Sequence, residues 1–172
     1  APAAAKKVIR LDPGLAFGTG THPTTRMCLR WIACHAQPWP RVLDYGCGSG
    51  ILAIGAALHG AKSVDAVDID SAAVESTRAN AQANGVALNA ALPHAAHGAY
   101  DLVLANILAK PLTLLAPLLT AHLAGDASLV LAGILERQAD ELRAAYEPWC
   151  ALDVADSDDG WILMTATTAA AR

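Results

Sequence analysis

Three glycines, each separated by a single residue, follow a short apolar run that ends in an aspartate. The stretch reads V-L-D-Y-G-C-G-S-G-I-L over residues 42–52, with glycines at positions 46, 48 and 50. Apolar residues then recur at helical spacing, as expected of a helix that packs on a sheet. This order predicts a strand, a tight turn and a helix, because glycine lets the backbone turn sharply and approach a ligand closely. The helix would present free N–H groups to whatever lies in the turn.

The spacing of these glycines discriminates between nucleotide-binding motifs. Counted from Gly46, the dinucleotide pattern G-x-G-x-x-G requires glycine at position 51, where the chain has Ile51. Counted from Gly48 it ends at Ala53, a tolerated variant, so a dinucleotide and hydride-transfer chemistry are disfavoured but stay open. A P-loop would need Gly-Lys-Ser/Thr, which is absent here. The pattern that fits best is D-x-G-x-G-x-G, and a glycine-rich turn without a ligand is the alternative.

A carboxylate follows at the distance expected for ribose recognition. Residues 63–68 read S-V-D-A-V-D and predict a strand with Asp68 at its carboxyl end, 18 positions after Gly50. Ligands of open parallel sheets lie at this end, and a carboxylate there accepts hydrogen bonds from ribose hydroxyls. Asp65 competes for this role but lies within the strand. The alternative is that Asp68 and Asp70 only end the strand and cap the next helix.

Strands and helices alternate along the chain. Further strands are predicted at residues 41–44, 86–90, 101–105 and 128–131, and helices at 26–36, 71–84, 110–122 and 135–146. Residues 149–154 and 161–167 predict a hairpin around an acidic turn at 156–160. Thr24 or Thr25 is expected to cap the first helix, and Arg26 and Arg30 to face water. The predicted fold class is α/β, a mostly parallel sheet with helices on both faces and a closing antiparallel hairpin.

Composition and charge exclude several classes of protein. The 172 residues are 54% hydrophobic and 16% charged, so one globular domain with its own core is expected. A net charge of −4 without a basic run argues against direct nucleic-acid binding. No apolar run approaches the roughly 18 residues of a membrane helix. The four cysteines lack zinc-ligand spacing, and His94 and His97 fall in a predicted loop, so reduced thiols, no metal and a cytoplasmic location are expected.

The first 25 residues divide into two parts. Residues 1–10 are alanine-rich without an amphipathic period and predict the remnant of a linker. Residues 11–25 read L-D-P-G-L-A-F-G-T-G-T-H-P-T-T, and this loop is expected either to close over a site or to pack on the core. His22, which precedes Pro23, is expected to fix this loop rather than to act as a base.

Three stretches together resemble one family. They are the loop at residues 11–25, D-Y-G-C-G-S-G-I-L-A-I from Asp44, and D-L-V-L-A-N-I-L-A from Asp101. Over essentially its whole length the chain resembles the PrmA family, methyltransferases that modify amino groups of large-subunit ribosomal protein eleven. The resemblance implies a class I S-adenosylmethionine-dependent methyltransferase (Rossmann-like) fold with seven strands, and a catalytic domain at residues 11–172. It also implies an amino-terminal domain that recognises the ribosomal protein and that this chain lacks.

The resemblance also implies a cofactor site for S-adenosylmethionine and its product S-adenosylhomocysteine. Four positions are implied to contact the cofactor: Thr25, Gly46, Asp68 and Asn106. Three more are expected to belong to the same site: Asp44, Gly48 and Ile69. Phe17 is expected as a lid over the methionyl or sulfonium part, because an aromatic face favours positive charge.

Asn106 is the expected catalytic residue. Amino methyltransferases often hold the acceptor amine at an Asn/Asp-Pro-Pro-aromatic turn after the fourth strand. The corresponding turn here is Asn106-Ile107-Leu108-Ala109, which keeps the asparagine and lacks both prolines and the aromatic residue. The alternative is that Asn106 only caps the helix that follows.

The implied activity is the transfer of methyl groups to lysine side chains or an α-amine of a ribosomal protein. Besides a dehydrogenase that uses the dinucleotide considered above, two alternative functions stay open. One is a methyltransferase for a small molecule or for RNA, although the acidic net charge disfavours RNA. The other is a cofactor-binding module without catalysis. Without its recognition domain, the chain is expected to bind cofactor almost normally and to methylate the ribosomal protein slowly, because binding energy from that domain brings the amine to the methyl group.

Overall fold

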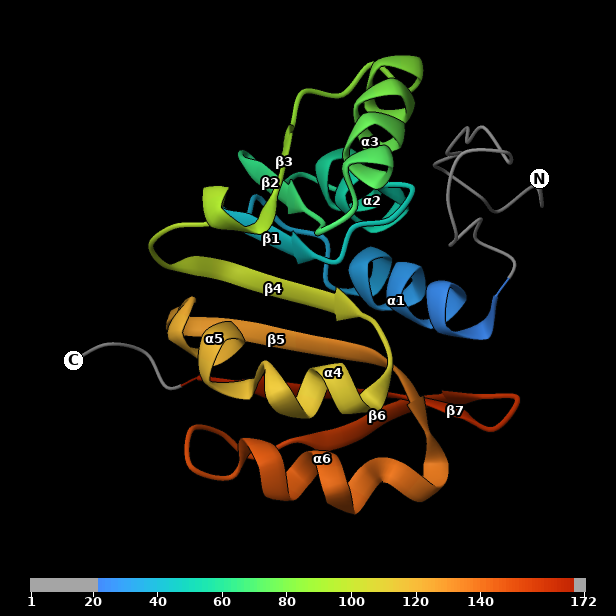
Figure 1. The fold of residues 1–172 in the computed structure, drawn as a ribbon, viewed down its shortest axis with the longest axis vertical. Helices are drawn as coiled ribbons and strands as arrows, with labels where there is room; N and C mark the ends of the chain where they lie inside the picture. The colour runs from blue at the N-terminus through green and yellow to red at the C-terminus, as the bar shows by residue number, and fades with distance from the viewer. Residues whose placement is uncertain (1–21, 169–172) are drawn as a thin grey trace.

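The computed structural model describes residues 22–168. The predicted linker at residues 1–10 and the predicted lid Phe17 lie outside the described residues. The seven strands of this described part form one sheet in the order β3-β2-β1-β4-β5-β7-β6 (Figure 1). Their bounds are Val42–Tyr45 (β1), Val64–Val67 (β2), Asn89–Ala91 (β3), Tyr100–Asn106 (β4), Leu123–Leu135 (β5), Asp153–Asp158 (β6) and Trp161–Thr167 (β7).

Strands β1 to β5 run parallel, and β7 runs antiparallel to both β5 and β6. The prediction of a mostly parallel sheet closed by a hairpin is therefore confirmed. The parallel strands leave their carboxyl ends at one edge of the sheet, where ligands of such folds bind.

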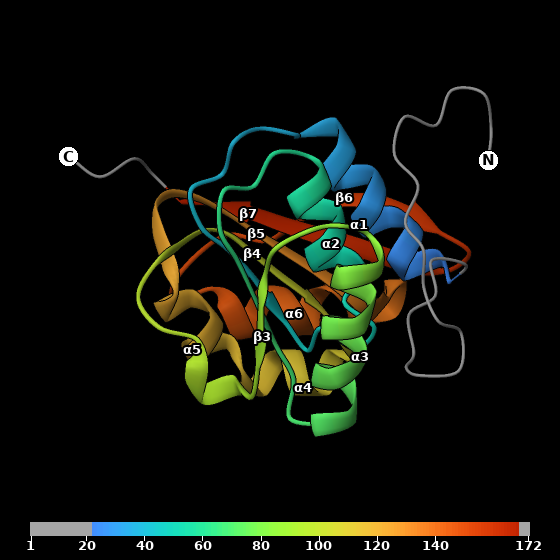
Figure 2. The ribbon, with the colours of Figure 1, turned by 90° about the horizontal axis from the view of Figure 1, so that it is seen from above.

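Six α-helices cover the sheet within the described residues. They are α1 (Pro23–Cys34), α2 (Ile51–Leu58), α3 (Ser71–Ala83), α4 (Ala109–Leu114), α5 (Ala116–Ala121) and α6 (Ala139–Tyr146). Apolar side chains of α1 and α2 pack on one face of the sheet, and those of α4, α5 and α6 pack on the other (Figure 2). Helix α3 lies beside α2. None of these helices is long and apolar enough to cross a membrane.

Two predicted helices differ from the observed ones. The helix predicted at residues 110–122 is broken at Leu115, which separates α4 from α5. Pro117 explains the break, because proline has no N–H to donate in a helix interior but is tolerated in a first turn. The helix predicted at residues 135–146 begins later, since β5 continues to Leu135 by pairing with Trp161 and a 3₁₀ turn follows before α6.

Strand and hairpin boundaries also differ from the sequence prediction. Strand β6 extends to Asp158, so the acidic turn predicted at residues 156–160 shrinks to Asp159 and Gly160, which both have positive φ. The third strand is shorter and later than predicted, and β5 is longer. The reason is pairing: β3 follows the register of β2, and β5 lies between β4 and β7.

Candidate active site

A cavity of about 780 Å³ opens at the carboxyl ends of β1, β2 and β4. Elements far apart in the sequence line it: the start of α1, the glycine turn, the end of β2, the turn after β4, Gly133 in β5 and Trp161 in β7. Six of the eight predicted site residues line this cavity: Thr25, Asp44, Gly46, Gly48, Asp68 and Asn106. Ile69, also predicted, is 84% exposed beside Asp68 and does not belong to the lining.

The glycine turn needs its glycines for conformation and for space. Gly46, Gly48 and Gly50 have φ of +78°, +55° and +87°, a region that side chains disfavour. A Cβ on Gly50 would lie 2.8 Å from Thr77 Cγ2 of α3. The Thr77 hydroxyl donates a hydrogen bond of 3.0 Å to the carbonyl of Gly48. Helix α3 therefore holds the turn, a role for Thr77 that the local sequence did not signal.

Asp44, at the start of this turn, is buried with one oxygen unpaired. Its Oδ2 accepts a hydrogen bond of 3.1 Å from the Ala53 N–H, and its Oδ1 has no partner within residues 22–168. Burial raises the pKa of Asp44 to about 7; the Asp68 charge also raises it, and the bond from Ala53 opposes the rise. A buried acceptor without a partner, facing a cavity, fits a ligand that carries positive charge.

Asp68 connects the end of β2 to the glycine turn. Its Oδ2 accepts a hydrogen bond of 3.0 Å from the Gly48 N–H, and its Oδ1 accepts one of 2.9 Å from the Asp70 N–H. Each oxygen keeps a further lone pair for a ligand hydroxyl. Asp70, rather than Asp68, caps α3 through the Ala72 N–H.

The competing carboxylate Asp65 is held elsewhere. Its Oδ2 accepts a hydrogen bond of 2.6 Å from the Tyr100 hydroxyl, and its Oδ1 accepts one of 3.0 Å from Asn89. The Arg41 guanidinium lies 3.4 Å from the same Oδ2 and 4.1 Å from the centre of the Tyr100 ring. Asp65 is bound in this network and does not line the cavity, whereas Asp68 does.

Asn106 ends β4, where it pairs with Ala132 of β5. With Ile107 and Leu108 it lines the cavity. The residue that caps α4 is Leu108, so the alternative that Asn106 is the helix cap is wrong. Asn106 therefore lies at the carboxyl end of β4, at the edge of the sheet where ligands of such folds bind.

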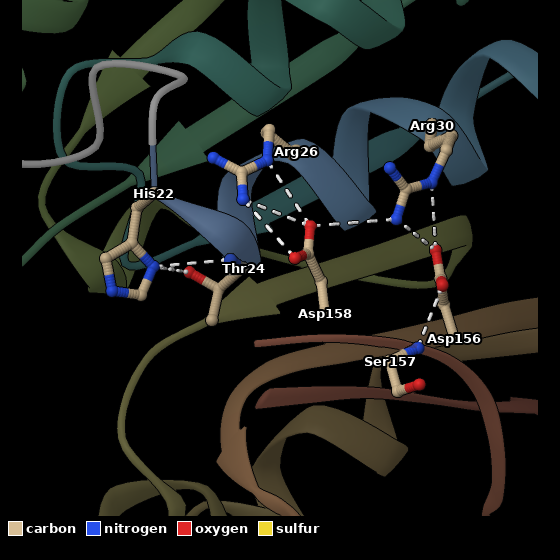
Figure 3. A network of polar contacts seen from close by, with 7 residues as sticks. All are labelled: His22, Thr24, Arg26, Arg30, Asp156, Ser157 and Asp158. Carbon is tan, nitrogen blue, oxygen red and sulfur yellow. Dashed lines mark hydrogen bonds and ion pairs between the residues drawn. The ribbon is translucent and has the colours of Figure 1, made fainter. Parts of the chain in front are cut away.

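The start of α1 lies beside Trp161 of β7. His22 caps α1 by accepting a hydrogen bond of 3.2 Å from the Thr24 N–H (Figure 3). The caps predicted from the sequence, Thr24 and Thr25, are buried instead. The His22 ring meets the Trp161 ring edge-on, with 5.1 Å between ring centroids. No local pattern linked these two residues, because they are brought together only by the tertiary fold.

Ion pairs of Arg26 and Arg30 join α1 to the edge strand β6. Arg26 pairs with Asp158 at 3.2 Å, and Arg30 pairs with Asp156 at 2.9 Å (Figure 3). Both arginines are exposed, as predicted, and they also form surface pairs because Asp156 and Asp158 belong to a strand rather than to a turn. Surface pairs of this kind stabilise a protein little individually. Here they join α1, whose first turn lines the cavity, to the strand that pairs with β7.

The described residues contain no group of histidine, cysteine and carboxylate side chains that could hold a metal ion. His94 and His97 are exposed. All four cysteines are free thiols. Burial raises the pKa of Cys47, in the glycine turn, to about 12, which keeps this thiol protonated and unreactive.

Comparison with known proteins identifies the family. The profile of the "Ribosomal protein L11 methyltransferase (PrmA)" family matches residues 1–169. A relative of that name from Polaromonas sp. strain JS666 is 71% identical over 168 residues, which cover 96% of this chain and 56% of the relative. A relative from Cupriavidus necator is 52% identical over 95% of this chain and 55% of its own length. The chain thus spans about half the length of these relatives.

Solved structures agree with this assignment. The crystal structure of a ribosomal protein L11 methylase from Lactobacillus delbrueckii subsp. bulgaricus has a TM-score of 0.85 and 36% identity, covering 95% of this chain and 86% of that one. A 16S rRNA methyltransferase of T. thermophilus, at 20% identity, has a TM-score of 0.73 over 89% of this chain and 45% of that one, and shares the fold alone. The fold is that of class I S-adenosylmethionine-dependent methyltransferases, as the resemblance implied. The chain therefore belongs to the ribosomal protein L11 methyltransferase (PrmA) family.

Proposed function

We propose that this chain binds S-adenosylmethionine and forms the catalytic part of a protein N-methyltransferase. The observation that carries the proposal is the convergence of Asp44, Asp68 and Asn106 on one cavity built over a glycine turn. The names of the relatives support ribosomal protein L11 as the substrate. Because the relatives are about twice as long, the substrate and the activity of the whole protein belong to this proposal.

The residues present fit S-adenosylmethionine. This cofactor carries two positive groups, a sulfonium and an ammonium, and the unpaired Oδ1 of buried Asp44 supplies a negative acceptor. It also carries ribose hydroxyls, for which Asp68 keeps lone pairs at the end of β2. Gly46 and Gly48 of the glycine turn line the cavity, with positive φ values that side chains disfavour. Thr25 is buried at the start of α1 and lines the same cavity.

When bound, S-adenosylmethionine supplies an activated methyl group, so the remaining tasks of the protein are orientation and exclusion of water. In this proposal the side-chain oxygen of Asn106 accepts a hydrogen bond from the acceptor amine. Such a bond would direct the nitrogen lone pair toward the methyl group. The amine must be neutral to react, and a free lysine, with a pKa of about 10.4, is protonated at neutral pH.

The proposal extends to partners and location. The chain carries a net charge of −4 without a basic run, which supports a protein substrate over direct nucleic-acid binding. A ribosomal-protein substrate and the lack of a helix suited to a membrane within the described residues support a cytoplasmic location. A separate amino-terminal domain that recognises the ribosomal protein is part of the same proposal.

Two measurements test the proposed function. Calorimetry with S-adenosylmethionine, S-adenosylhomocysteine and NAD should show binding of the first two and not of NAD. Transfer of labelled methyl groups to purified ribosomal protein L11 should be far slower for this chain alone than for a fusion with the unmatched region of the Polaromonas relative. Binding of NAD without binding of S-adenosylmethionine would refute the cofactor, and equal methylation rates would refute the need for a recognition domain.

A further inference from the structure

Ile107, in the turn after β4, packs closely between two glycines of different elements, Gly46 and Gly133. On one side, a Cβ on Gly133 of β5 would overlap the Ile107 carbonyl oxygen and lie 2.7 Å from the Ile107 carbonyl carbon. On the other side, a Cβ on Gly46 would lie 2.7 Å from Ile107 Cγ2. Carbon atoms that are not bonded pack at about 3.5–4.0 Å. Only glycine therefore fits on either side of Ile107.

Gly133 stands where the regular pairing of β5 is interrupted. The register between β5 and β7 shifts between Leu131 and Ile134, and Gly133 within this irregularity has φ of +89°. Its neighbour Ala132 forms the last pair with Asn106 of β4. Bulges of this kind redirect the backbone next to functional sites. In this chain the bulge brings residue 133 against the residue that follows Asn106.

The apolar core also holds Ile107 in position. Its side chain is half-buried and packs on the apolar core that β4 and β5 form with α4 to α6. Its backbone rests on Gly133 and its Cγ2 faces Gly46, while Asn106, Ile107 and both glycines line the cavity. A residue that is held by backbone and side chain together restricts the position of its neighbour. Asn106 is thereby placed relative to the glycine turn.

We propose that Gly133 and Gly46 form a seat for Ile107, and that this seat sets the position of the Asn106 amide at the cavity. The inference rests on the proposed methyltransferase function, in which Asn106 orients the acceptor amine. Gly133 and Ile107 are then positioning residues that act through Asn106. A misplacement on the order of 1 Å in an active site lowers the rate about 100-fold.

Gly133→Ala tests the seat, and Gly85→Ala is its matched control. Gly85 also has a positive φ, +66°, and a Cβ there would meet nothing within 4 Å. Both changes carry the backbone cost of alanine at positive φ, and only Gly133→Ala displaces Ile107. In the fusion used above, Gly133→Ala should lower kcat on the order of 100-fold, more than it lowers affinity for S-adenosylmethionine. Equal kcat in the two variants, or parallel losses of kcat and affinity, would overturn the proposal.

A second pair of variants decides the question if Gly133→Ala folds poorly. Ile107→Val keeps the Cγ2 atom that faces Gly46, whereas Ile107→Leu keeps the volume and removes the branch at Cβ. The valine variant should retain turnover and the leucine variant should lose it. Equal turnover of the two variants would contradict the seat.

A spectroscopic measurement separates this inference from the proposed function. The side-chain amide signal of Asn106 in a ¹⁵N NMR spectrum should move in Gly133→Ala and Ile107→Leu, and stay in place in Gly85→Ala and Ile107→Val. An unmoved Asn106 signal in the first two variants overturns the seat. A wild-type fusion that transfers no methyl group refutes the proposed function instead, and the NMR result still decides whether the seat positions Asn106.

Discussion

Protonation of Asp44 should control the affinity of the chain for its cofactor. Burial raises the pKa of this carboxyl to about 7, and its Oδ1 lacks a partner within residues 22–168. A cationic group of S-adenosylmethionine would bind the ionised form. With a pKa of about 7, roughly half of the carboxyl is ionised at pH 7 and about 3% at pH 5.5. The dissociation constant should therefore rise about 16-fold as the pH falls across this interval, or about 1.6 kcal/mol.

Calorimetric titration of S-adenosylmethionine at both pH values, at matched ionic strength, measures this ratio. Asp44→Asn should bind more weakly and with little pH dependence, because the amide does not titrate. His22 also lines the cavity, so His22→Gln serves as a control variant that should keep the pH dependence of the wild type. If wild-type and Asp44→Asn chains show the same pH dependence, the assignment of the cation to Asp44 is refuted.

Three further predictions follow from the same cavity. Asp68→Ala should weaken S-adenosylmethionine binding by about 1.5–3 kcal/mol, because hydrogen bonds to a charged acceptor are lost. Unchanged affinity in calorimetry would mean that another residue contacts the ribose. Asn106→Ala should reduce methyl transfer by the fusion protein more than it reduces cofactor affinity, and intact turnover would contradict its role in holding the amine. Asp44→Asn should raise the Tm of the free chain more at about pH 8 than at about pH 5. The reason is that a carboxyl whose pKa is raised in the folded state destabilises the fold as the pH rises through that pKa. Equal gains in Tm at the two pH values would argue against a buried charge on Asp44.

Features set by neighbouring residues were predictable from the sequence. The glycine turn follows from the local need for positive φ at Gly46, Gly48 and Gly50. Asp68 could be chosen over Asp65 because the end of a strand is visible in a local apolar pattern, and the structure indeed turns Asp65 toward Tyr100. The layered arrangement of helices on a sheet was predictable for the same reason, because the alternation of strands and helices is also visible in local apolar patterns.

Features set by tertiary contacts were not predictable in this way. The cap of α1 falls on His22, whose ring also meets Trp161 from the other end of the chain. The ion pairs of Arg26 and Arg30 depend on how far β6 extends, which its pairing with β7 decides. Gly133 carries no distinct local signal, since its requirement for glycine arises from the backbone of Ile107.

The attachment of α1 to β6 has a consequence for the timing of synthesis. Arg26 and Asp158 are 132 positions apart, so the ribosome makes the arginine long before its partner. At about 5–20 residues per second, the interval is roughly 7–26 s. During that time the α1 wall of the cavity lacks both its ionic attachment and the Trp161 ring. A nascent chain released or stalled before β6 should therefore capture no cofactor, and the finished site should form only as the last strands leave the exit tunnel.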